Sequence, residues 1–203
     1  MTPLHELAAD RVIAVVRAPA IPDAAALCAA LAEGGIRWVE FTFTTPDVTA
    51  HVRRAVAADT GCRIGVGTVL TAGQAEQAVE AGARYLVTPG LRPAVAAAPV
   101  PVVLGALTPS EVADALDLGA AAVKVFPARA FGPSYLRDLR GPFPDAPLVA
   151  SGGVSAANAA AFLAAGALAV CAGGEVVSPA LVAAADWPEL TRRARAFVRS
   201  LEG

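Results

Sequence analysis

Short β-branched runs recur along the chain, and each is followed by an alanine-rich segment of helical length. Strands that alternate with helices are typical of a parallel sheet, and eight such units close a (β/α)₈ barrel. Eight runs are present, at residues 12–17, 37–43, 63–67, 85–89, 100–105, 121–126, 147–151 and 167–174. The sequence therefore predicts an α/β fold, a single (β/α)₈ TIM barrel that occupies residues 1–203 as one domain.

The ends of the expected helices carry suitable capping residues. An open doubly wound sheet would also alternate strands and helices, but no G-x-G-x-x-G opens a first helix here. The expected helix starts are Pro22-Asp23, Pro46-Asp47, Thr71, Pro109-Ser110-Glu111 and Ser155. The expected stops are Gly34-Gly35, Gly61, Gly82, Gly119 and Gly166. The absence of the glycine motif favours the barrel, in which polar residues should gather at the carboxyl ends of the strands.

Charge and composition exclude several classes of protein. The net charge of -2 gives no positive field for a phosphate backbone, so nucleic acid is not an expected partner. The longest apolar stretch, 159–174, is mostly alanine with internal glycines, so no membrane span is expected. The N-terminal segment carries Glu6 and Asp10 before its apolar run and has no basic leader. We therefore expect a cytoplasmic protein without a signal peptide.

The cysteines and histidines do not form metal-binding or redox patterns. Cys28, Cys62 and Cys171 are odd in number and fall in no such spacing, which fits reduced thiols that pack the core. His5 and His51 are the only histidines, and neither has a ligand-like partner nearby in the sequence. A histidine-built divalent metal site is therefore not expected.

Lys124 is the only lysine, whereas the other fifteen basic residues are arginines. Arginine stays protonated, but a desolvated lysine can lose its proton and attack a carbonyl group. Strand alternation places Ala122, Lys124 and Phe126 on the inner face of the barrel, where an ammonium group is costly unless it is paired. Lys124 is therefore a candidate Schiff-base nucleophile, and the competing interpretation is a structural buried ion pair.

Glu40 is the second candidate catalytic residue. It lies within the apolar run WVEFTF, where Trp38, Glu40 and Thr42 share one face. Beside an amine that forms and hydrolyses an imine, this carboxylate can transfer protons during dehydration and carbon–carbon cleavage. Its simpler interpretation is a counter-ion for Lys124, and the two roles are compatible.

Further residues at strand ends suit the binding of anions. Thr68 follows Gly65-Val66-Gly67 and offers a hydroxyl for a carboxylate, while Arg17 can pair with a carboxylate or form a surface salt bridge. Ser151-Gly152-Gly153 and Gly173-Gly174 end the last two strands, where many barrels bind phosphate on backbone N–H groups. Tight turns are the alternative interpretation of both glycine pairs.

Six ordered motifs resemble the class I 2-keto-3-deoxy-6-phosphogluconate (KDPG) aldolases, which often also cleave 4-hydroxy-2-oxoglutarate (KHG). The motifs are GGIRWVEFTFTTPD at 34–47, IGVGTVLT at 64–71, AGARYLVTPGL at 81–91, VKVFPA at 123–128, ASGGVS at 150–155 and AGG at 172–174. The resemblance spans nearly the whole chain. It implies a lyase of the Entner-Doudoroff type that yields pyruvate, needs no metal or cofactor and acts as a homotrimer on a phosphorylated keto acid.

The resemblance also implies roles for individual residues. Lys124 would form the imine, and Glu40 would act as acid and base through a water. Thr68 and Arg17 would bind the carboxylate, Pro89 and Phe126 would line the pocket, and the loops at Gly152-Gly153 and Gly173-Gly174, with Ser151 before the first pair, would bind phosphate.

Three positions depart from the pattern of the family. Thr44 stands where many members carry an arginine, and Ser151 replaces a common threonine. Glu175 lies where a serine that contacts phosphate often follows the glycines, and a carboxylate there would repel phosphate unless it points away.

Three alternative functions remain open at this stage. The segment FPARAFGPSYL at 126–136 also resembles the 2-keto-3-deoxy-6-phosphogalactonate aldolase branch. A phosphosugar isomerase or synthase barrel would use Lys124 only as an electrostatic clamp. A barrel that binds ligand without catalysis would explain Thr44 and Glu175 as signs of decay.

Overall fold

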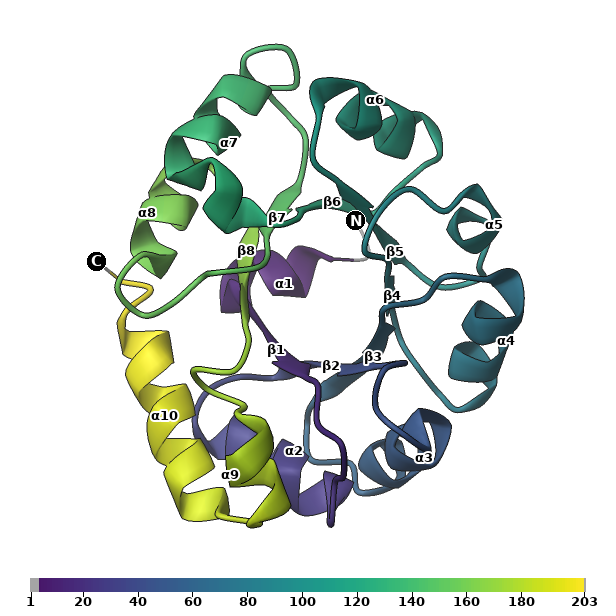
Figure 1. Ribbon diagram of the computed structural model, residues 1–203, viewed down its shortest axis with the longest axis vertical. Helices are drawn as coiled ribbons and strands as arrows, with labels where there is room; N and C mark the ends of the chain where they lie inside the picture. The colour runs from purple at the N-terminus through teal and green to yellow at the C-terminus, as the bar shows by residue number, and fades with distance from the viewer. Residues whose placement is uncertain (1–3, 203) are drawn as a thin grey trace.

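The computed structural model describes residues 4–202 and shows a closed barrel of parallel strands in sequence order, with β1 paired to both β2 and β8. Figure 1 looks into this ring of strands. The strands are β1 (Val12–Val16), β2 (Trp38–Thr42), β3 (Arg63–Gly67), β4 (Leu86–Val87), β5 (Val102–Ala106), β6 (Ala122–Val125), β7 (Leu148–Ala150) and β8 (Ala169–Ala172). The predicted (β/α)₈ barrel is confirmed.

Helices surround the barrel, and α1 lies across one end of it (Figure 1). The helices are α1 (His5–Asp10), α2 (Ala24–Glu33), α3 (Val48–Ala57), α4 (Ala72–Glu80), α5 (Pro93–Ala96), α6 (Pro109–Asp117), the 3₁₀ turn η1 (Ala128–Ala130), α7 (Gly132–Arg140), α8 (Ala159–Ala164), α9 (Pro179–Ala183) and α10 (Trp187–Arg199). None of the helices within residues 4–202 is long and apolar enough to cross a membrane.

Most of the expected helix starts agree with the structure. Asp23 and Thr71 accept hydrogen bonds from Ala26 N–H and Gln74 N–H and so cap α2 and α4. Thr108 caps α6, one residue before the predicted start, and forms a reciprocal capping box with Glu111.

The start predicted at Ser155 is wrong, because α8 begins at Ala159. The Asn158 side chain accepts the Ser155 N–H at 2.8 Å and donates to Gly153 O at 3.0 Å, which holds the intervening residues in turns. Local side-chain bonds of this kind compete with the first helical turn.

The fourth strand is shorter than the predicted 85–89 and covers only Leu86–Val87. The Thr88 N–H still donates to Val103 O of β5 at 3.0 Å, but the Gly105 N–H bonds to the Thr88 hydroxyl at 3.0 Å instead of a backbone carbonyl, and that hydroxyl donates to Gly90 O at 2.7 Å. Pro89 has no N–H to continue the ladder. The chain therefore leaves the sheet directly before the loop that carries Pro89.

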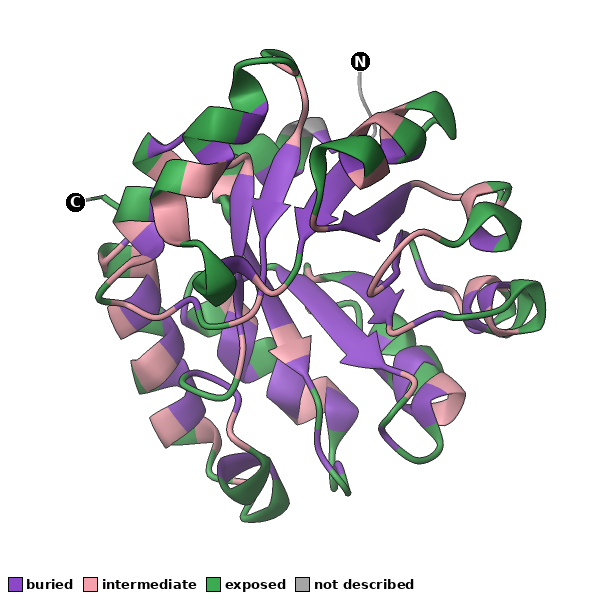
Figure 2. Ribbon diagram, turned by 45° about the horizontal axis from the view of Figure 1, so that its top comes forward, coloured by how far each residue is buried: buried purple, intermediate pink, exposed green. Residues whose placement is uncertain are grey.

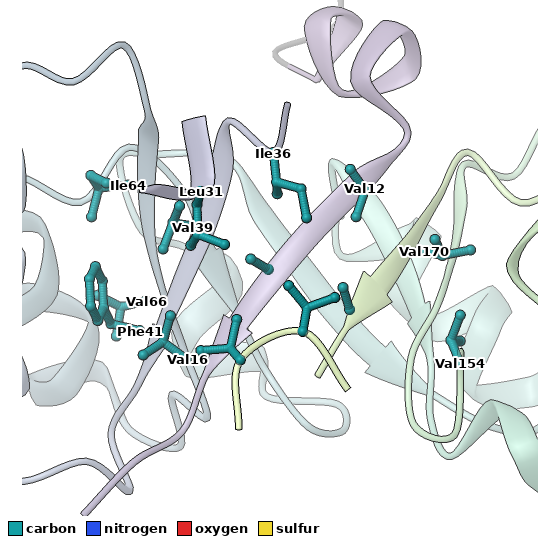
Figure 3. Packing of buried hydrophobic residues seen from close by; sticks show 14 of the residues in the cluster. Val12, Val16, Leu31, Ile36, Val39, Phe41, Ile64, Val66, Val154 and Val170 are labelled. Atoms are coloured by element: carbon teal, nitrogen blue, oxygen red, sulfur yellow. The ribbon is translucent and has the colours of Figure 1, made fainter. Parts of the chain in front are cut away.

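The hydrophobic core has two parts. The larger part lies between the strands and the helices and includes the outward Val39 and Val123 and the helical Leu31. Figure 2 shows the strands buried and the outer faces of the helices exposed, and Figure 3 shows side chains of β1–β3 packed with Leu31 and Ile36. Truncation of a fully buried leucine such as Leu31 to alanine costs about 2–5 kcal/mol.

The smaller part fills the barrel interior at the end that α1 covers, where Leu4 and Leu7 pack with inward strand residues. These are Ile13, Trp38, Tyr85, Val87, Val103, Ala122, Val149, Ala169 and Cys171. Nearer the carboxyl ends of the strands, the inward positions change to polar residues and glycines, among them Thr42, Gly67, Gly105 and Lys124. Bulky apolar side chains therefore close one end of the barrel, and the other end carries the chemistry.

Candidate active site

Lys124 points into the barrel from β6, as strand alternation predicts, and the residue is 6% exposed. Its neighbours in register are Gly105 on β5 and Val149 on β7, and the Nζ atom lies 5.3 Å from the centroid of the Phe126 ring. No ion pair within residues 4–202 involves Lys124. A primary amine that no carboxylate contacts is free to react with a carbonyl group.

Glu40 is fully buried on β2, and neither carboxylate oxygen has a hydrogen-bond partner in the described part of the chain. The carboxylate lies over Gly67 of β3, where a Cβ atom would overlap Oε1. The lack of a direct ion pair with Lys124 argues against the interpretation of Glu40 as only a counter-ion. An unpartnered buried carboxylate is costly in a structural role but available for proton transfer.

Thr68 and Arg17 lie together at the mouth of the barrel. The exposed Arg17 side chain donates from Nη2 to Thr68 Oγ1 at 3.4 Å. Thr68 has a φ of 57°, a left-handed conformation that is strained for a β-branched residue and is found mainly where function requires it. Nearby, the Thr42 and Thr44 hydroxyls form a 2.8 Å hydrogen bond, so Thr44 contributes a neutral hydroxyl here.

Pro89 and Phe126 form part of the rim. The backbone at Pro89 passes so close to Gly105 that a Cβ at Gly105 would overlap it. Phe126 is 40% exposed, which is unusual for a phenylalanine, and its ring lies against Gly152. The two residues therefore offer apolar surface on either side of β6.

The glycine loops at the ends of β7 and β8 present unused backbone donors. The backbone hydrogen bonds found between described residues include none donated by the N–H groups of Gly152, Gly153, Gly173 or Gly174. Gly152 and Gly153 have φ angles of 88° and 82°, and a Cβ at Gly173 or Gly174 would meet no atom within 4 Å. Such open N–H groups can bind an anion. Ser151 is buried before these loops, and its carbonyl accepts Ala128 N–H at 2.7 Å.

Glu175 joins the two glycine loops. Its Oε2 accepts the Ala156 N–H at 2.9 Å, and its carbonyl oxygen accepts from Arg193 at 3.3 Å. The carboxylate therefore remains close to the unused N–H donors, although it does not neutralise them by direct bonds. A phosphate in these loops would lie near this negative charge.

Sequence reasoning missed two residues near these groups. Arg129 on η1 crosses Gly153, where a Cβ would overlap its side chain, and strand alternation gives no information about such a turn. Tyr85 is buried inside the barrel, and its hydroxyl has no partner in the described structure. Alternation with Val87 could have placed Tyr85 on the inner face.

Burial shifts the pKa values of Cys171 and His51 in opposite directions. Burial raises the pKa of the Cys171 thiol to about 11, so this thiol remains protonated inside the barrel. Burial also lowers the pKa of His51 on α3, while the side chain of His5 lies outside the described structure. Within the described residues, no three histidine, cysteine, aspartate or glutamate side chains cluster as metal ligands would.

The comparison with protein families agrees with this geometry. The family model for KDPG and KHG aldolases matches residues 5–193. The chain belongs to the KDPG and KHG aldolase family. Members of this family are lyases, and this assignment separates the chain from the isomerase and synthase barrels considered above.

Individual KDPG and KHG aldolases and their relatives are similar in sequence to this chain over most of its length. The 2-dehydro-3-deoxy-phosphogluconate aldolase of Treponema pallidum is 36% identical over 89% of each chain. A probable 2-dehydro-3-deoxy-6-phosphogalactonate aldolase of Rhizobium meliloti is 35% identical over 84% of each chain. The KDPG aldolase of Legionella pneumophila, solved with pyruvate captured as a covalent carbinolamine, is 30% identical with a TM-score of 0.89 over 97% of this chain and 98% of that one.

Proposed function

We propose that the protein is a class I aldolase that reversibly cleaves KDPG to pyruvate and glyceraldehyde 3-phosphate, KHG to pyruvate and glyoxylate, or both. One observation carries this proposal: the only lysine of the chain is buried inside the barrel without an ion pair, and an unpartnered carboxylate, Glu40, lies on the facing wall. Among the residues that line the barrel, Lys124 is the one whose side chain can form an imine.

The reaction follows from these two groups. The neutral Nζ of Lys124 attacks the C2 carbonyl of the keto acid, and the carbinolamine loses water to form an iminium ion. The Glu40 carboxylate removes the proton of the C4 hydroxyl, and the C3–C4 bond breaks as the aldehyde leaves. The electron pair of that bond forms the C2–C3 double bond of an enamine, while the π pair of the iminium moves to Nζ. Protonation of C3 and hydrolysis then release pyruvate and restore Lys124.

The remaining site residues bind the substrate in this proposal. Thr68 and Arg17 hold the C1 carboxylate, since they are adjacent hydroxyl and guanidinium groups at the mouth. Pro89 and Phe126 contact the carbon chain. The distal end of the substrate binds to Ser151 and to the N–H groups of Gly152, Gly153, Gly173 and Gly174. The charge of Glu175 weakens the affinity of these groups for phosphate.

No metal or organic cofactor takes part in this mechanism, because the protonated imine accepts the electron pair of the broken bond. The test is pyruvate release from KDPG and from KHG with and without a metal chelator. Turnover that is unchanged by the chelator supports the class I mechanism. Loss of turnover on chelation, restored by a divalent metal, would contradict it.

The 6-phosphogalactonate analogue is a second candidate substrate. The resemblance at 126–136 and the 35% identity with the Rhizobium meliloti relative favour it. This substrate differs from KDPG at one carbinol centre, so the same catalytic groups would act on it. A pyruvate-release assay with both epimers compares their kcat/KM values directly.

We further propose that residues 1–203 form one domain, that the active form is a cytoplasmic homotrimer, and that no nucleic acid or membrane takes part. The resemblance to the family supports the trimer, and the net charge of -2 supports the absence of nucleic acid. Light scattering on the purified protein would give the mass of a trimer of 20.4 kDa subunits, and the mass of a monomer would contradict the proposal.

A further inference from the structure

Tyr85 lies inside the barrel directly before β4, is fully buried, and has a hydroxyl without a partner in the described structure. Two contacts hold its ring. The ring lies against Gly65, where a Cβ would overlap it, and its centroid is 5.1 Å from the Trp38 ring at an angle of 57°. The position of the Tyr85 ring is therefore fixed by its neighbours, although its hydroxyl is unused.

The strand register places Tyr85 and Glu40 on either side of the same glycine. Glu40 pairs with Gly65, and Val66 pairs with Leu86, which puts Tyr85 beside Gly65 on the other side. Two strand spacings separate the Cα atoms of Glu40 and Tyr85 by about 10 Å. Since Gly65 has no side chain, nothing on β3 stands between the two, and their side chains can meet over it.

The two groups are complementary. A buried phenol needs an acceptor and a buried carboxylate needs donors, and buried polar groups in proteins are almost always hydrogen-bonded. Burial, and next the negative charge of Glu40, raise the pKa of Tyr85 well above its usual range, so the hydroxyl keeps its proton. The other ionisable groups that face this part of the interior are Lys124 on β6 and Cys171 on β8.

We propose that Tyr85 is a positioning residue for Glu40. Its hydroxyl and the Glu40 carboxylate are not directly bonded, so the hydroxyl donates to the carboxylate through one bridging water. The Tyr85 ring lies against Gly65, and the carboxylate lies against Gly67, two residues nearer the carboxyl end of β3. The carboxylate is therefore held toward the mouth of the barrel, where it faces the substrate on Lys124. This inference rests on the proposed function, because it assigns Tyr85 a task in the same proton transfer.

The test replaces the hydroxyl alone. Tyr85→Phe keeps the ring and its contacts with Gly65 and Trp38. We expect kcat for aldol cleavage to fall about tenfold while KM changes less than twofold. Without the donor the protonated carboxyl is favoured, so the acidic limb of the pH–rate profile moves to higher pH. The matched control is Tyr135→Phe, since Tyr135 is the only other tyrosine and its hydroxyl, on α7, donates to the carbonyl oxygen of Leu107, the residue after β5.

A double-mutant cycle separates positioning from packing. If Tyr85 acts through Glu40, then Tyr85→Phe reduces kcat little further in a Glu40→Gln background, and the two substitutions are also coupled in the free energy of unfolding, which needs no activity. Additive effects in both measurements, or an unchanged pH profile for Tyr85→Phe, would overturn the proposal.

Borohydride trapping of pyruvate distinguishes failure of this inference from failure of the proposed function. The wild-type protein and Tyr85→Phe should both form the adduct on Lys124. An adduct in both proteins with equal cleavage rates would overturn the role of Tyr85 and leave the Schiff-base mechanism intact. The absence of an adduct in the wild-type protein would instead contradict the mechanism itself.

Discussion

Glu40 and Lys124 stand on opposite walls of the barrel, on β2 and β6, and both are buried without forming an ion pair with each other. Two opposite charges that serve only stability would be expected to meet, because an unpaired buried charge is costly. In the proposed mechanism the substrate lies between these two groups, a nucleophile and a proton acceptor. The arrangement fits a substrate that bonds to one group and exchanges protons with the other.

Replacement of Lys124 by methionine should abolish catalysis and stabilise the fold. The substitution keeps a side chain of similar length but removes both the nucleophile and a buried amine without an ion pair among the described residues. We expect no detectable aldol cleavage and a gain of about 1–2 kcal/mol in the free energy of unfolding. For a chain of this size that gain raises the Tm by about 2–8 °C, which calorimetry can measure. A loss of stability would indicate that Lys124 has a structural partner.

Replacement of Gly67 by alanine should displace the Glu40 carboxylate. The added Cβ would overlap Oε1, whereas the backbone of Gly67 does not have a positive φ and accepts alanine. A misplacement of about 1 Å can cost roughly 100-fold in rate, so we expect kcat to fall between tenfold and a hundredfold.

The control for this prediction is Gly73→Ala on α4, where a Cβ meets nothing within 4 Å. Alanine in this helix should leave kcat unchanged and raise the free energy of unfolding by about 0.5–1 kcal/mol. Equal rates for both glycine variants would show that the position of Glu40 does not limit the reaction.

Removal of the charge of Glu175 should improve the use of phosphorylated substrates. We expect Glu175→Ser and Glu175→Gln to lower the KM for KDPG about fivefold, since one charge near the mouth contributes on the order of 1 kcal/mol. The KM for KHG, which has no phosphate, should change less than twofold. Steady-state kinetics at low and high salt would measure this, because screening reduces the difference. Unchanged KM values for KDPG in both variants would mean that the carboxylate does not affect the bound phosphate.

Cys62 should be the thiol that reacts in the native protein. The neighbouring Cys28 side chain is the largest cause that lowers the pKa of Cys62 to about 7, while burial raises that of Cys171 to about 11. A thiolate reacts faster than a thiol, so alkylation of Cys62 should rise through pH 7 and level off above pH 8. Mass spectrometry after iodoacetamide treatment gives the site and the rate. In Cys28→Ala the rise should move to higher pH, and an unchanged profile would contradict the role of Cys28.

The strand positions and the inward direction of Lys124 and Glu40 could be predicted because they depend on local patterns. Alternation along a strand fixes the face of each residue, and parallel strands bring their carboxyl ends to one edge. The predicted barrel and the predicted family were both confirmed.

The relation between Tyr85 and Glu40 could not be predicted, since it depends on the register of three strands that lie far apart in the sequence. The bond from Ala156 N–H to Glu175 depends on the conformations of two separate loops. The start of α8 was misplaced because the Asn158 side chain competes with the helix for the backbone at Ser155.

The central claim, that Lys124 is the covalent catalyst, is tested most directly by incubation with pyruvate, reduction with borohydride and peptide mapping by mass spectrometry. The account predicts one reduced pyruvate adduct, located on Lys124 and absent from Lys124→Met. No adduct on a folded protein, or an adduct at the N-terminal amine alone, would contradict it.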